Sequence, residues 1–462
     1  MTLIKSISGI RGTIGGNVGD NLTPIDAVKF ASAYGTWIKQ QRDKDNYRVV
    51  VGRDARISGE MIQNLVMNTL VGLGIHVIDL GLSTTPTVEV AVPMEHADGG
   101  IILTASHNPK QWNALKLLDA KGEFLNGEEG AKILKLAEGT DMTFADVDSL
   151  GKITINDAYI DLHIDEVLDM DLVNVEAIKK VNFKVVVDGV NSTGGIAIPL
   201  LLERLGVHPV KLFCEPNGQF PHNPEPLKEH LTDLSKAVVK EHADFGIVVD
   251  PDVDRLAFMD EKGEMFGEEY TLVACADYVL SKTKGNTVSN MSSTRALRDI
   301  TEKHGGTYEA SAVGEVNVVS LMKKNNAIIG GEGNGGIIYP ELHYGRDALV
   351  GVALFLSLLA EKKMNVSDLR ASYPNYYMSK KKIQLTPELD VDGILSTMEA
   401  KYAHENLTTI DGVKIDFSDS WVHLRKSNTE PIIRIYTEAP SQNEADALAN
   451  KIISEIKDIA NI

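Results

Sequence analysis

Hydrophobic and polar positions follow the same order three times along the chain. An apolar, β-branched run is followed by a helical pattern, a second apolar run and a polar loop. The strand-like runs cover residues 49–54, 74–78, 100–103, 185–188, 206–210, 245–249, 286–288, 305–308 and 327–329, and the helical patterns cover residues 60–72, 198–205 and 295–304. Strands that alternate with helices predict mixed or parallel sheets, so the pattern predicts three α/β domains. Three passes of one pattern indicate related domains, although generic α/β alternation without shared ancestry would look similar.

The pattern changes near residue 372. A strand-like run at 432–436 and a helical pattern at 443–459 predict a smaller α+β domain at the end of the chain. A polar, Asp-rich segment at 140–157 and a turn at 260–263 indicate the other boundaries. We therefore expect four domains, at residues 1–150, 151–256, 257–370 and 371–462.

Composition and charge narrow the class of protein. Of the 462 residues, 43% are hydrophobic and 24% are charged, which is typical of a folded globular chain of several domains. The formal net charge of -19 argues against nucleic acid or an anionic membrane surface as the main partner, so an anionic small substrate must meet local clusters of Arg and Lys. Cys214 and Cys275 lie far apart without the paired spacing of a metal site, which favours a reducing compartment. No apolar run approaches the roughly 18 residues of a membrane span and no signal-peptide core is present, so we expect a cytoplasmic protein.

The first informative polar loop follows the apolar run at 100–103 and has the sequence TASHNP at residues 104–109. Its hydroxyl at Ser106 lies at the carboxyl end of a predicted strand, where open α/β sheets bind ligands. Asn108 and Pro109 favour a turn. A serine beside a histidine is by itself a weak indication of a nucleophile, because a solvated turn with an incidental pair is common. A function for this loop can therefore be inferred only together with the other polar loops.

A second polar loop, with the sequence DPDVDR, carries Asp250, Asp252 and Asp254 directly after an apolar strand. Alternate side chains of extended backbone share a face, so we expect the three carboxylates to converge on one hard cation such as Mg²⁺. An EF-hand also begins with alternating acids, but it needs a glycine where this chain has Arg255 and a helix where this chain has a strand. A solvated acidic turn is the remaining alternative. Because Mg²⁺ usually keeps positions open for phosphate oxygens, the loop indicates a phosphorylated partner.

Two further loops offer groups that suit a sugar phosphate. Residues 330–336, with the sequence GGEGNGG, lack the ending of a P-loop and the spacing of a dinucleotide loop. Glu332 and Asn334 offer an acceptor and an amide for sugar hydroxyls, although a structural glycine turn explains this stretch equally well. Residues 425–431, with the sequence RKSNTEP, and the nearby Arg434 combine cations, hydroxyls and loop N–H groups. Such a combination favours a dianion site, with a surface turn as the alternative.

Taken together and in this order, the four loops resemble those of the α-D-phosphohexomutases. That family has a phosphoserine loop of the Thr-Ala-Ser-His-Asn-Pro type, an Asp-x-Asp-x-Asp-Arg metal loop, a Gly-Glu-x-x-Gly sugar loop and an Arg-x-Ser-x-Thr-Glu-Pro phosphate loop. The resemblance covers the whole chain, including SGIRG at residues 8–12 and GRD at residues 52–54. It implies three related α/β domains with mixed sheets and a C-terminal α+β domain, in a four-domain, heart-shaped architecture.

The resemblance also implies a role for individual residues. Ser106 would be the phosphoserine and would share one Mg²⁺ with Asp250, Asp252 and Asp254. The groups implied at the phosphoryl centre are Lys116, which corresponds to a lysine used in proton transfer, and Arg11, His107 and Arg255. The groups implied in substrate binding are Glu332 and Asn334 for the sugar, and Arg425, Ser427, Asn428, Thr429 and Arg434 for the phosphate that does not react.

The implied activity is interconversion of hexose 6-phosphate and hexose 1-phosphate through the phosphoserine and a bound 1,6-bisphosphate, with a hexose 1,6-bisphosphate as activator. Phosphomannomutase/phosphoglucomutase enzymes usually have Ser and His where this chain has Asn334 and Gly336. Together with YGRD at residues 344–347, this loop looks more like that of the archaeal-type phosphoglucosamine mutases. We therefore expect conversion of glucosamine 6-phosphate to glucosamine 1-phosphate, with a broad-specificity phosphoglucomutase/phosphomannomutase as the alternative. We expect His343 to be a solvated loop histidine rather than a base.

Two other classes of protein remain open. A metal-dependent phosphoserine hydrolase would also use a serine and a metal, but would normally need more ligands than one Asp triplet and no distal phosphate site. A non-catalytic, Ca²⁺-dependent sugar-phosphate binder would explain the acidic loop but not Ser106 beside Lys116. The expected partner is a small hexose phosphate, and the sequence does not distinguish a monomer from a homodimer.

Overall fold

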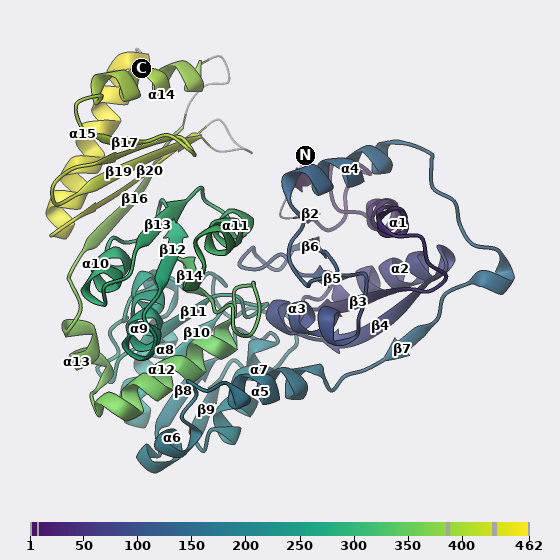
Figure 1. Ribbon diagram of the computed structural model, residues 1–462, viewed down its shortest axis with the longest axis horizontal. Coiled ribbons are helices and arrows are strands. Elements are labelled where there is room, and N and C mark those ends of the chain that lie inside the picture. The colour runs from purple at the N-terminus through teal and green to yellow at the C-terminus, as the bar shows by residue number, and fades with distance from the viewer. Residues whose placement is uncertain (1, 7–8, 385–388, 427–431, 461–462) are drawn as a thin grey trace. The chain divides into compact units, whose positions relative to one another are not determined.

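The computed structural model describes residues 2–6, 9–384, 389–426 and 432–460 (Figure 1). The chain forms two compact units, Met1–Val279 with Asn334–Leu369, and Leu280–Gly333 with Arg370–Ile462. Across the described ranges, no helix is both long and apolar enough to cross a membrane.

The first sheet of the first unit has seven strands in the order β1-β2-β6-β5-β3-β4-β7. They are β1 (Ile4–Ser6), β2 (Gly9–Thr13), β3 (Tyr47–Arg53), β4 (Ile75–Leu82), β5 (Gly99–Leu103), β6 (Trp112–Leu118) and β7 (Ile153–Ile155). Strand β3 is parallel to β4 and β5, whereas β6 is antiparallel to β5 and β2. The sheet is therefore mixed, as predicted, and the Ser106 loop connects the adjacent strands β5 and β6.

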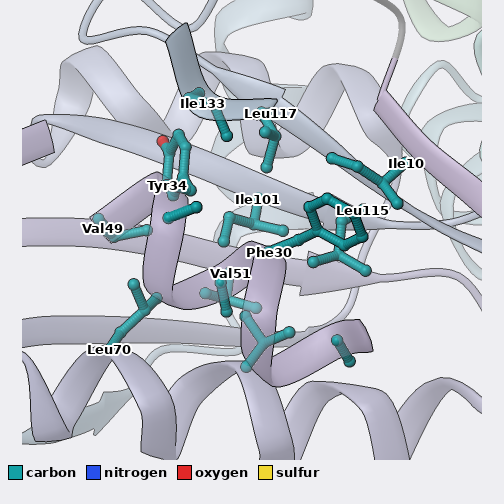
Figure 2. Packing of buried hydrophobic residues seen from close by; sticks show 14 of the residues in the cluster. Ile10, Phe30, Tyr34, Val49, Val51, Leu70, Ile101, Leu115, Leu117 and Ile133 are labelled. Atoms are coloured by element: carbon teal, nitrogen blue, oxygen red, sulfur yellow. The ribbon is translucent and has the colours of Figure 1, made fainter. Parts of the chain in front are cut away.

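Helices cover both faces of this sheet. They are α1 (Pro24–Gln41), α2 (Gly59–Gly72), α3 (Thr85–Met94) and α4 (Gly127–Glu138). Because successive strand side chains point to opposite faces, Val49 and Val51 of β3 pack in one core with residues of α1, α2 and α4, while Val50 packs in another with residues of α3. Figure 2 shows Phe30, Tyr34 and Leu70 from the helices in the first of these cores. The result is a three-layer α/β/α arrangement that fixes the strand ends.

The Asp-rich segment expected between the first two domains contains a short 3₁₀ helix, Val147–Ser149, and adds an edge strand to the first sheet. Strand β7 pairs in parallel with β4. All three of its residues are exposed, and a run of three residues, Ile-Thr-Ile, is too short for its alternation to predict a strand.

A second sheet in the first unit has four strands in the order β11-β10-β8-β9. They are β8 (Lys184–Asp188), β9 (His208–Leu212), β10 (Phe245–Val249) and β11 (Leu256–Met259), with helices α5 (Tyr159–Asp169), α6 (Val175–Val181), α7 (Gly194–Arg204) and α8 (Thr232–Glu241), and a 3₁₀ helix at Lys228–His230. Strand β10 is parallel to β8 and antiparallel to β11. The DPDVDR loop is the turn between β10 and β11, so its position depends on two buried strands.

Four further elements follow along the chain: α9 (Glu268–Lys282), β15 (Gly336–Ile338), α12 (Ala348–Lys362) and α13 (Val366–Ala371). Every residue of α12 from 348 to 360 is buried, which is typical of a helix at the centre of a large core.

The second unit contains residues 280–333 of the predicted third domain and all of the predicted fourth domain, whereas residues 257–279 and 334–369 belong to the first unit. Strand β12 (Asn286–Asn290) lies between its parallel neighbours β13 (Tyr308–Ser311) and β14 (Ala327–Glu332), with helices α10 (Ala296–Lys303) and α11 (Glu315–Asn325). Strand β13 begins at the end of the run predicted at 305–308, because Gly305 adopts a positive φ of 72° in the turn after α10. An α/β arrangement was predicted for this part of the chain, and it is confirmed.

The C-terminal part of the second unit is an antiparallel sheet in the order β16-β20-β19-β18-β17. Its strands are β16 (Tyr377–Gln384), β17 (Asn406–Thr408), β18 (Val413–Asp416), β19 (Trp421–Lys426) and β20 (Ile432–Ala439), with helices α14 (Val391–Lys401) and α15 (Gln442–Ala460). Buried residues of α14 and α15 pack in one core with those of the sheet. The predicted α+β domain is confirmed.

Candidate active site

Ser106 lies just beyond the end of β5 in a strained conformation. Its φ of 48° is in the left-handed region, which residues with a side chain rarely occupy. The backbone N–H of Ser106 donates to Thr104 Oγ1 over 3.0 Å, and that hydroxyl donates to Asp54 Oδ2 over 2.7 Å. The residue is only 7% exposed. The loop thus holds one hydroxyl at a defined point inside the molecule.

A single buried arginine, Arg56, fixes the backbone of this loop. Its guanidinium donates to the carbonyl oxygens of residues 106, 108, 109 and 112 over 2.5–2.9 Å. It also pairs with Asp54 over 2.9 Å. Burial raises the pKa of Asp54, and the charge of Arg56 opposes that rise. Sequence analysis noted Asp54 but missed Arg56, whose only signal was its position just after the carboxyl end of β3.

The three carboxylates of the metal loop converge as predicted, but by a different backbone geometry. Extended backbone was expected to align them, whereas residues 250–254 form a turn in which Val253 has a φ of 66°. Their ligand atoms all lie within 4.8 Å of one another, and all three residues are fully buried. The turn is stabilised from within, because Asp250 Oδ1 accepts from the N–H groups of Asp254 and Arg255.

Ser106 and the metal loop are in direct contact. The Ser106 hydroxyl donates to Asp250 Oδ2 over 2.6 Å. Thr85, the first residue of α3, donates from its hydroxyl to Asp252 Oδ2 over 2.5 Å and from its N–H to the carbonyl oxygen of Asp252 over 2.8 Å. The first two α/β parts of the chain therefore meet at the Ser106 hydroxyl.

Two cations balance much of the negative charge. Lys116 Nζ lies 2.7 Å from Asp252 and 3.3 Å from Asp254, and Arg346 lies 2.7 Å from Asp254. Burial opposes ionisation of Asp252, but Lys116 lowers its pKa below the ordinary value. Burial likewise opposes the charge on Lys116, but the two carboxylates raise its pKa. Burial and the charges of Asp252 and Asp254 raise the pKa of Asp250 well above the ordinary value, and the charge of Arg255 opposes that rise only in part.

The chemistry of these donors fits a hard divalent cation. Oδ1 of Asp252 and Oδ1 of Asp254 are buried without a hydrogen-bond partner. A buried carboxylate oxygen that no donor reaches is costly unless a cation completes it. Three buried carboxylates beside a serine hydroxyl form an oxygen-only donor set, which Mg²⁺ prefers.

Two further predicted residues, His107 and Arg11, have shifted pKa values, and both lie near the charge of Arg255. His107 Nδ1 lies 3.3 Å from Ser106 Oγ, and burial together with the charge of Arg255 lowers the pKa of this imidazole well below its usual range. Burial and the charge of Arg255 also lower the pKa of Arg11, which lies on β2 opposite Ala114 of β6. Arg255 itself pairs with Glu225 over 3.1 Å. The positive charges of Arg11 and Arg255 repel each other, so a bound anion would stabilise them.

The two residues expected to bind the sugar belong to different units, which divide in the sequence between Gly333 and Asn334. Glu332, expected in a loop, is instead the last residue of β14 in the second unit, where Oε1 accepts from Asn290 Nδ2 over 2.9 Å and from Gly314 N over 3.2 Å. In the first unit, Asn334 Oδ1 accepts from Gly336 N over 3.2 Å. Gly335 has a φ of 85°, and an added Cβ would lie 2.1 Å from the carbonyl oxygen of Leu256. Packing alone therefore requires this glycine.

The expected phosphate loop is described in part. Arg425 Nε donates to Asp411 Oδ1 over 3.0 Å, and Arg425 stands opposite Arg434 in the pairing of β19 with β20. Ser427, Asn428 and Thr429 lie outside the described residues.

His343 is not the solvated histidine that was expected. Its side chain is only 9% exposed, and its ring nitrogens lie 3.2 Å from Asp347 and 3.4 Å from Glu89. This burial could not be predicted from local sequence, because Glu89 lies in α3, far from His343 along the chain.

Comparison with known proteins agrees with this geometry. Models of the four phosphoglucomutase/phosphomannomutase domains, the three alpha/beta/alpha domains and the C-terminal domain, match residues 3–143, 159–263, 267–377 and 378–455. A phosphoglucomutase/phosphomannomutase of Thermococcus kodakarensis is 37% identical over 94% of this chain and 95% of its own length. A phosphoglucosamine/phosphogalactosamine mutase of Sulfurisphaera tokodaii is 33% identical over 98% and 97%.

A solved structure supports the same conclusion. The crystal structure of a phosphoglucomutase/phosphomannomutase family protein from Burkholderia thailandensis has a TM-score of 0.85 and 25% identity over 99% of this chain and 98% of that chain. The relatives are mutases, which are isomerases. Four consecutive domain models, full-length relatives and a serine set against three buried carboxylates lead to one conclusion: the chain belongs to the phosphoglucomutase/phosphomannomutase family.

Proposed function

We propose that the protein is a phosphohexose mutase that moves a phosphoryl group between O6 and O1 of a hexose through phosphorylated Ser106. The observation that carries this proposal is the contact of Ser106 Oγ with Asp250 Oδ2 over 2.6 Å, at the edge of a buried carboxylate triad. A serine meant only for structure needs no such cluster, because three carboxylates in one buried place repel one another.

The proposed reaction has two balanced transfers. In the first, the P–Oγ bond of phosphoserine breaks, a P–O bond forms to the free sugar hydroxyl, and the proton of that hydroxyl passes to a protein base. In the second, the other phosphoryl group of the 1,6-bisphosphate returns to Ser106 Oγ, and the proton returns to the sugar oxygen. An added hexose 1,6-bisphosphate would activate an unphosphorylated enzyme by the second transfer alone.

Asp250, Asp252 and Asp254 would hold one Mg²⁺ together with an oxygen of the phosphorylated Ser106. When bound, Mg²⁺ supplies positive charge against the oxygens of the moving phosphoryl group, which is most of what phosphoryl transfer requires. Arg11 and Arg255 would add positive charge around the same group, since each is already close enough to affect the field at its neighbours.

Lys116 and His107 are the proposed proton carriers. Contact with Asp252 and Asp254 raises the pKa of Lys116 and keeps it an ammonium that holds its proton firmly, so it would exchange a proton with the sugar oxygen only when those contacts loosen. Burial and Arg255 lower the pKa of His107 and keep it neutral beside Ser106 Oγ. His107 would become a stronger base when the phosphoryl group brings negative charge next to it. Glu332 and Asn334 are proposed to bind the sugar, and residues 425–434 the other phosphate.

For the substrate, we propose glucosamine 6-phosphate and its 1-phosphate. The sugar loop is similar to that of archaeal-type phosphoglucosamine mutases, and several full-length relatives carry that name. The second candidate is a broad-specificity phosphoglucomutase/phosphomannomutase. It is favoured by the 37% identical relative of that name.

A phosphorus NMR time course tests both parts. Protein, Mg²⁺ and a trace of hexose 1,6-bisphosphate are incubated separately with glucosamine, glucose and mannose 6-phosphates. A 1-phosphate signal that grows mainly from glucosamine 6-phosphate supports the proposal. Comparable conversion of the other two sugars supports the broad-specificity enzyme, and free inorganic phosphate alone would mean a hydrolase.

A Ser106→Ala variant tests the mechanism. We expect mutase turnover to fall by at least about 10³-fold and the protein to accept no phosphoryl group from hexose 1,6-bisphosphate, measured by intact mass. Thr104→Ser, which keeps the neighbouring hydroxyl, is the matched control and should retain both properties. Near-normal turnover of Ser106→Ala would overturn the phosphoserine proposal.

A further inference from the structure

A second cluster of metal-ligating side chains lies within the first unit, apart from the Asp triad. His163 comes from α5, and His343 and Asp347 come from the segment that leads into α12. Their ligand atoms lie within 4.8 Å of one another. His163 Nε2 is 2.9 Å and His343 Nε2 is 3.2 Å from the same oxygen, Asp347 Oδ2.

The two imidazoles approach this point from different directions. Their ring planes are at 84° and their centroids are 6.2 Å apart. His163 is fully buried, Asp347 is 1% exposed, and the His343 side chain is 9% exposed. Two nitrogens and one oxygen therefore converge in a place that is almost closed to water.

The second nitrogen of His163 has a hydrogen-bond partner, and that of His343 has a carboxylate within ion-pair distance. His163 Nδ1 lies 2.9 Å from Thr87 Oγ1, which in turn lies 2.7 Å from Thr84 Oγ1. His343 Nδ1 lies 3.4 Å from Glu89 Oε2. Both Thr87 and Glu89 are buried residues of α3. A histidine that binds a metal through one nitrogen usually donates from the other to an oxygen of this kind.

Asp347 divides its two oxygens between two tasks. Oδ1 accepts from the N–H of Leu349 over 2.8 Å and caps α12. Oδ2 is left for the two rings.

We propose that His163 Nε2, His343 Nε2 and Asp347 Oδ2 form a second metal site that takes Zn²⁺. Two imidazole nitrogens and one carboxylate oxygen suit zinc, whereas the oxygen-only Asp triad suits magnesium. Donor atoms separated by 2.9 and 3.2 Å are close to the spacing of neighbouring ligands around a four-coordinate ion with bonds of about 2.0–2.1 Å. A water molecule would complete the fourth position.

Binding requires only a rearrangement of protons. Nε2 of each ring must be free of its proton, which moves to Nδ1 and is donated to Thr87 Oγ1 or Glu89 Oε2. A proton leaves the protein only if one ring was an imidazolium beforehand. The proposed ion would tie together α5, the start of α12 and, through the outer contacts, α3.

The test measures zinc bound by the full-length protein. Protein purified without chelator is incubated with excess Zn²⁺ in a buffer with millimolar Mg²⁺, dialysed, and analysed by elemental mass spectrometry. We expect about one zinc ion per chain in the unchanged protein and a loss of about tenfold or more in His163→Gln and His343→Gln. Two controls should keep the zinc: His404→Gln, whose side chain is 71% exposed, and Asp252→Asn in the Asp triad.

Cobalt gives a second readout that does not depend on whether a variant folds well. Co²⁺ added to the unchanged protein in excess Mg²⁺ should give the visible absorption of a four-coordinate site, and one equivalent of Zn²⁺ should abolish it. Zinc content far below one ion per chain together with no such absorption would mean a hydrogen-bonded network only, and would overturn the proposal. Zinc that is lost in Asp252→Asn but kept in His343→Gln would also overturn it. Neither outcome depends on whether the protein is a mutase.

Discussion

At the scale of single residues, three energetically unfavourable features lie around the Ser106 hydroxyl. Ser106 has a left-handed backbone conformation, Asp250 is a buried carboxyl group next to two other carboxylates, and Arg56 is a buried cation. A left-handed residue with a side chain costs roughly 1–2 kcal/mol, so its surroundings must hold it in place. The carbonyl contacts of Arg56 supply that restraint.

We therefore predict that Arg56→Lys loosens the Ser106 loop. Lysine keeps the charge, but its three donors cannot reproduce the planar set that reaches four carbonyl oxygens and Asp54. We expect stability to fall by about 2–4 kcal/mol and mutase kcat to fall by about 10²-fold. Urea unfolding and steady-state kinetics measure the two effects.

The neighbouring Arg53→Lys is the matched control for this prediction. Arg53 donates to Gln63 Oε1 and to the carbonyl oxygen of Asp54, rather than to carbonyl oxygens of the Ser106 loop. The kcat of the Arg53→Lys variant should stay within about threefold of the kcat of the unchanged protein. Equal losses in the two variants would argue against a specific role for Arg56.

Residue chemistry explains which site groups could be predicted. Ser106 and the three aspartates were found because each follows an apolar strand directly, and strand ends can be read from local sequence. Arg346 and Thr85 could not be found in this way, since their contacts with Asp254 and Asp252 join segments far apart in the chain. The cluster around His343 was missed for the same reason.

At the scale of elements, the fold depends on how each helix and loop begins. Helix α1 starts with a capping box in which Thr23 accepts from Asp26 N and the Asp26 side chain accepts from Thr23 N. Asp26 Oδ1 also accepts from Gly19 N over 3.1 Å, in the loop that follows β2. The cap therefore joins the first helix to the segment that leads away from Arg11.

We predict that Thr23→Ala lowers the free energy of unfolding by about 1 kcal/mol, because the N-cap acceptor is lost. Thr36→Ala in the same helix is the control, since its hydroxyl only bonds the carbonyl oxygen of Ser32 within the helix. That change should shift stability by no more than about 0.5 kcal/mol. Denaturant unfolding compares the two, and an equal cost would mean that the cap is not what stabilises α1.

Most elements were predictable because strands and helices in this chain have strong apolar patterns. Prediction was weaker where pattern ends: β7 is exposed throughout, and the metal loop bends at Val253. Nothing in the residue Val253 favours a φ of 66°, and it is imposed by a fully buried position between β10 and β11. The convergence of the acids was therefore predicted correctly for the wrong geometric reason.

At the scale of the whole molecule, each unit joins parts that sequence alone separates. In the second unit, His423 of β19 lies 2.8 Å from Ser292 Oγ, just beyond β12, so the antiparallel sheet contacts the α/β part. His423 Nε2 donates to the carbonyl oxygen of Asp411 over 2.7 Å, which leaves Nδ1 to accept from Ser292. Burial lowers the pKa of His423 to about 4.

This pKa predicts how the stability of the protein changes in acid. In the unfolded chain, His423 becomes protonated below the ordinary histidine pKa of about 6.5. In the folded protein, it becomes protonated only near pH 4. Protonation then favours unfolding, so this residue destabilises the fold progressively as pH falls, by about 3 kcal/mol at pH 4. His423→Gln should flatten the dependence of unfolding free energy on pH between 6.5 and 4.

His404→Gln provides the comparison for this measurement, because it removes a histidine whose side chain is 71% exposed. It should change the pH dependence of unfolding less than His423→Gln does. A His423→Gln curve parallel to that of the unchanged protein would contradict the assignment.

The burial of Ser106 has a consequence for how long the enzyme remains active between encounters with substrate. A phosphoryl group on a side chain that is 7% exposed, inside a ring of charged groups, is poorly reached by water. Under the proposed function, the phosphorylated enzyme would remain phosphorylated while no sugar is bound. Each product would then leave the phosphoryl group on Ser106 for the next substrate molecule. The enzyme would then need the activating hexose 1,6-bisphosphate only for its first phosphorylation and not in every catalytic cycle.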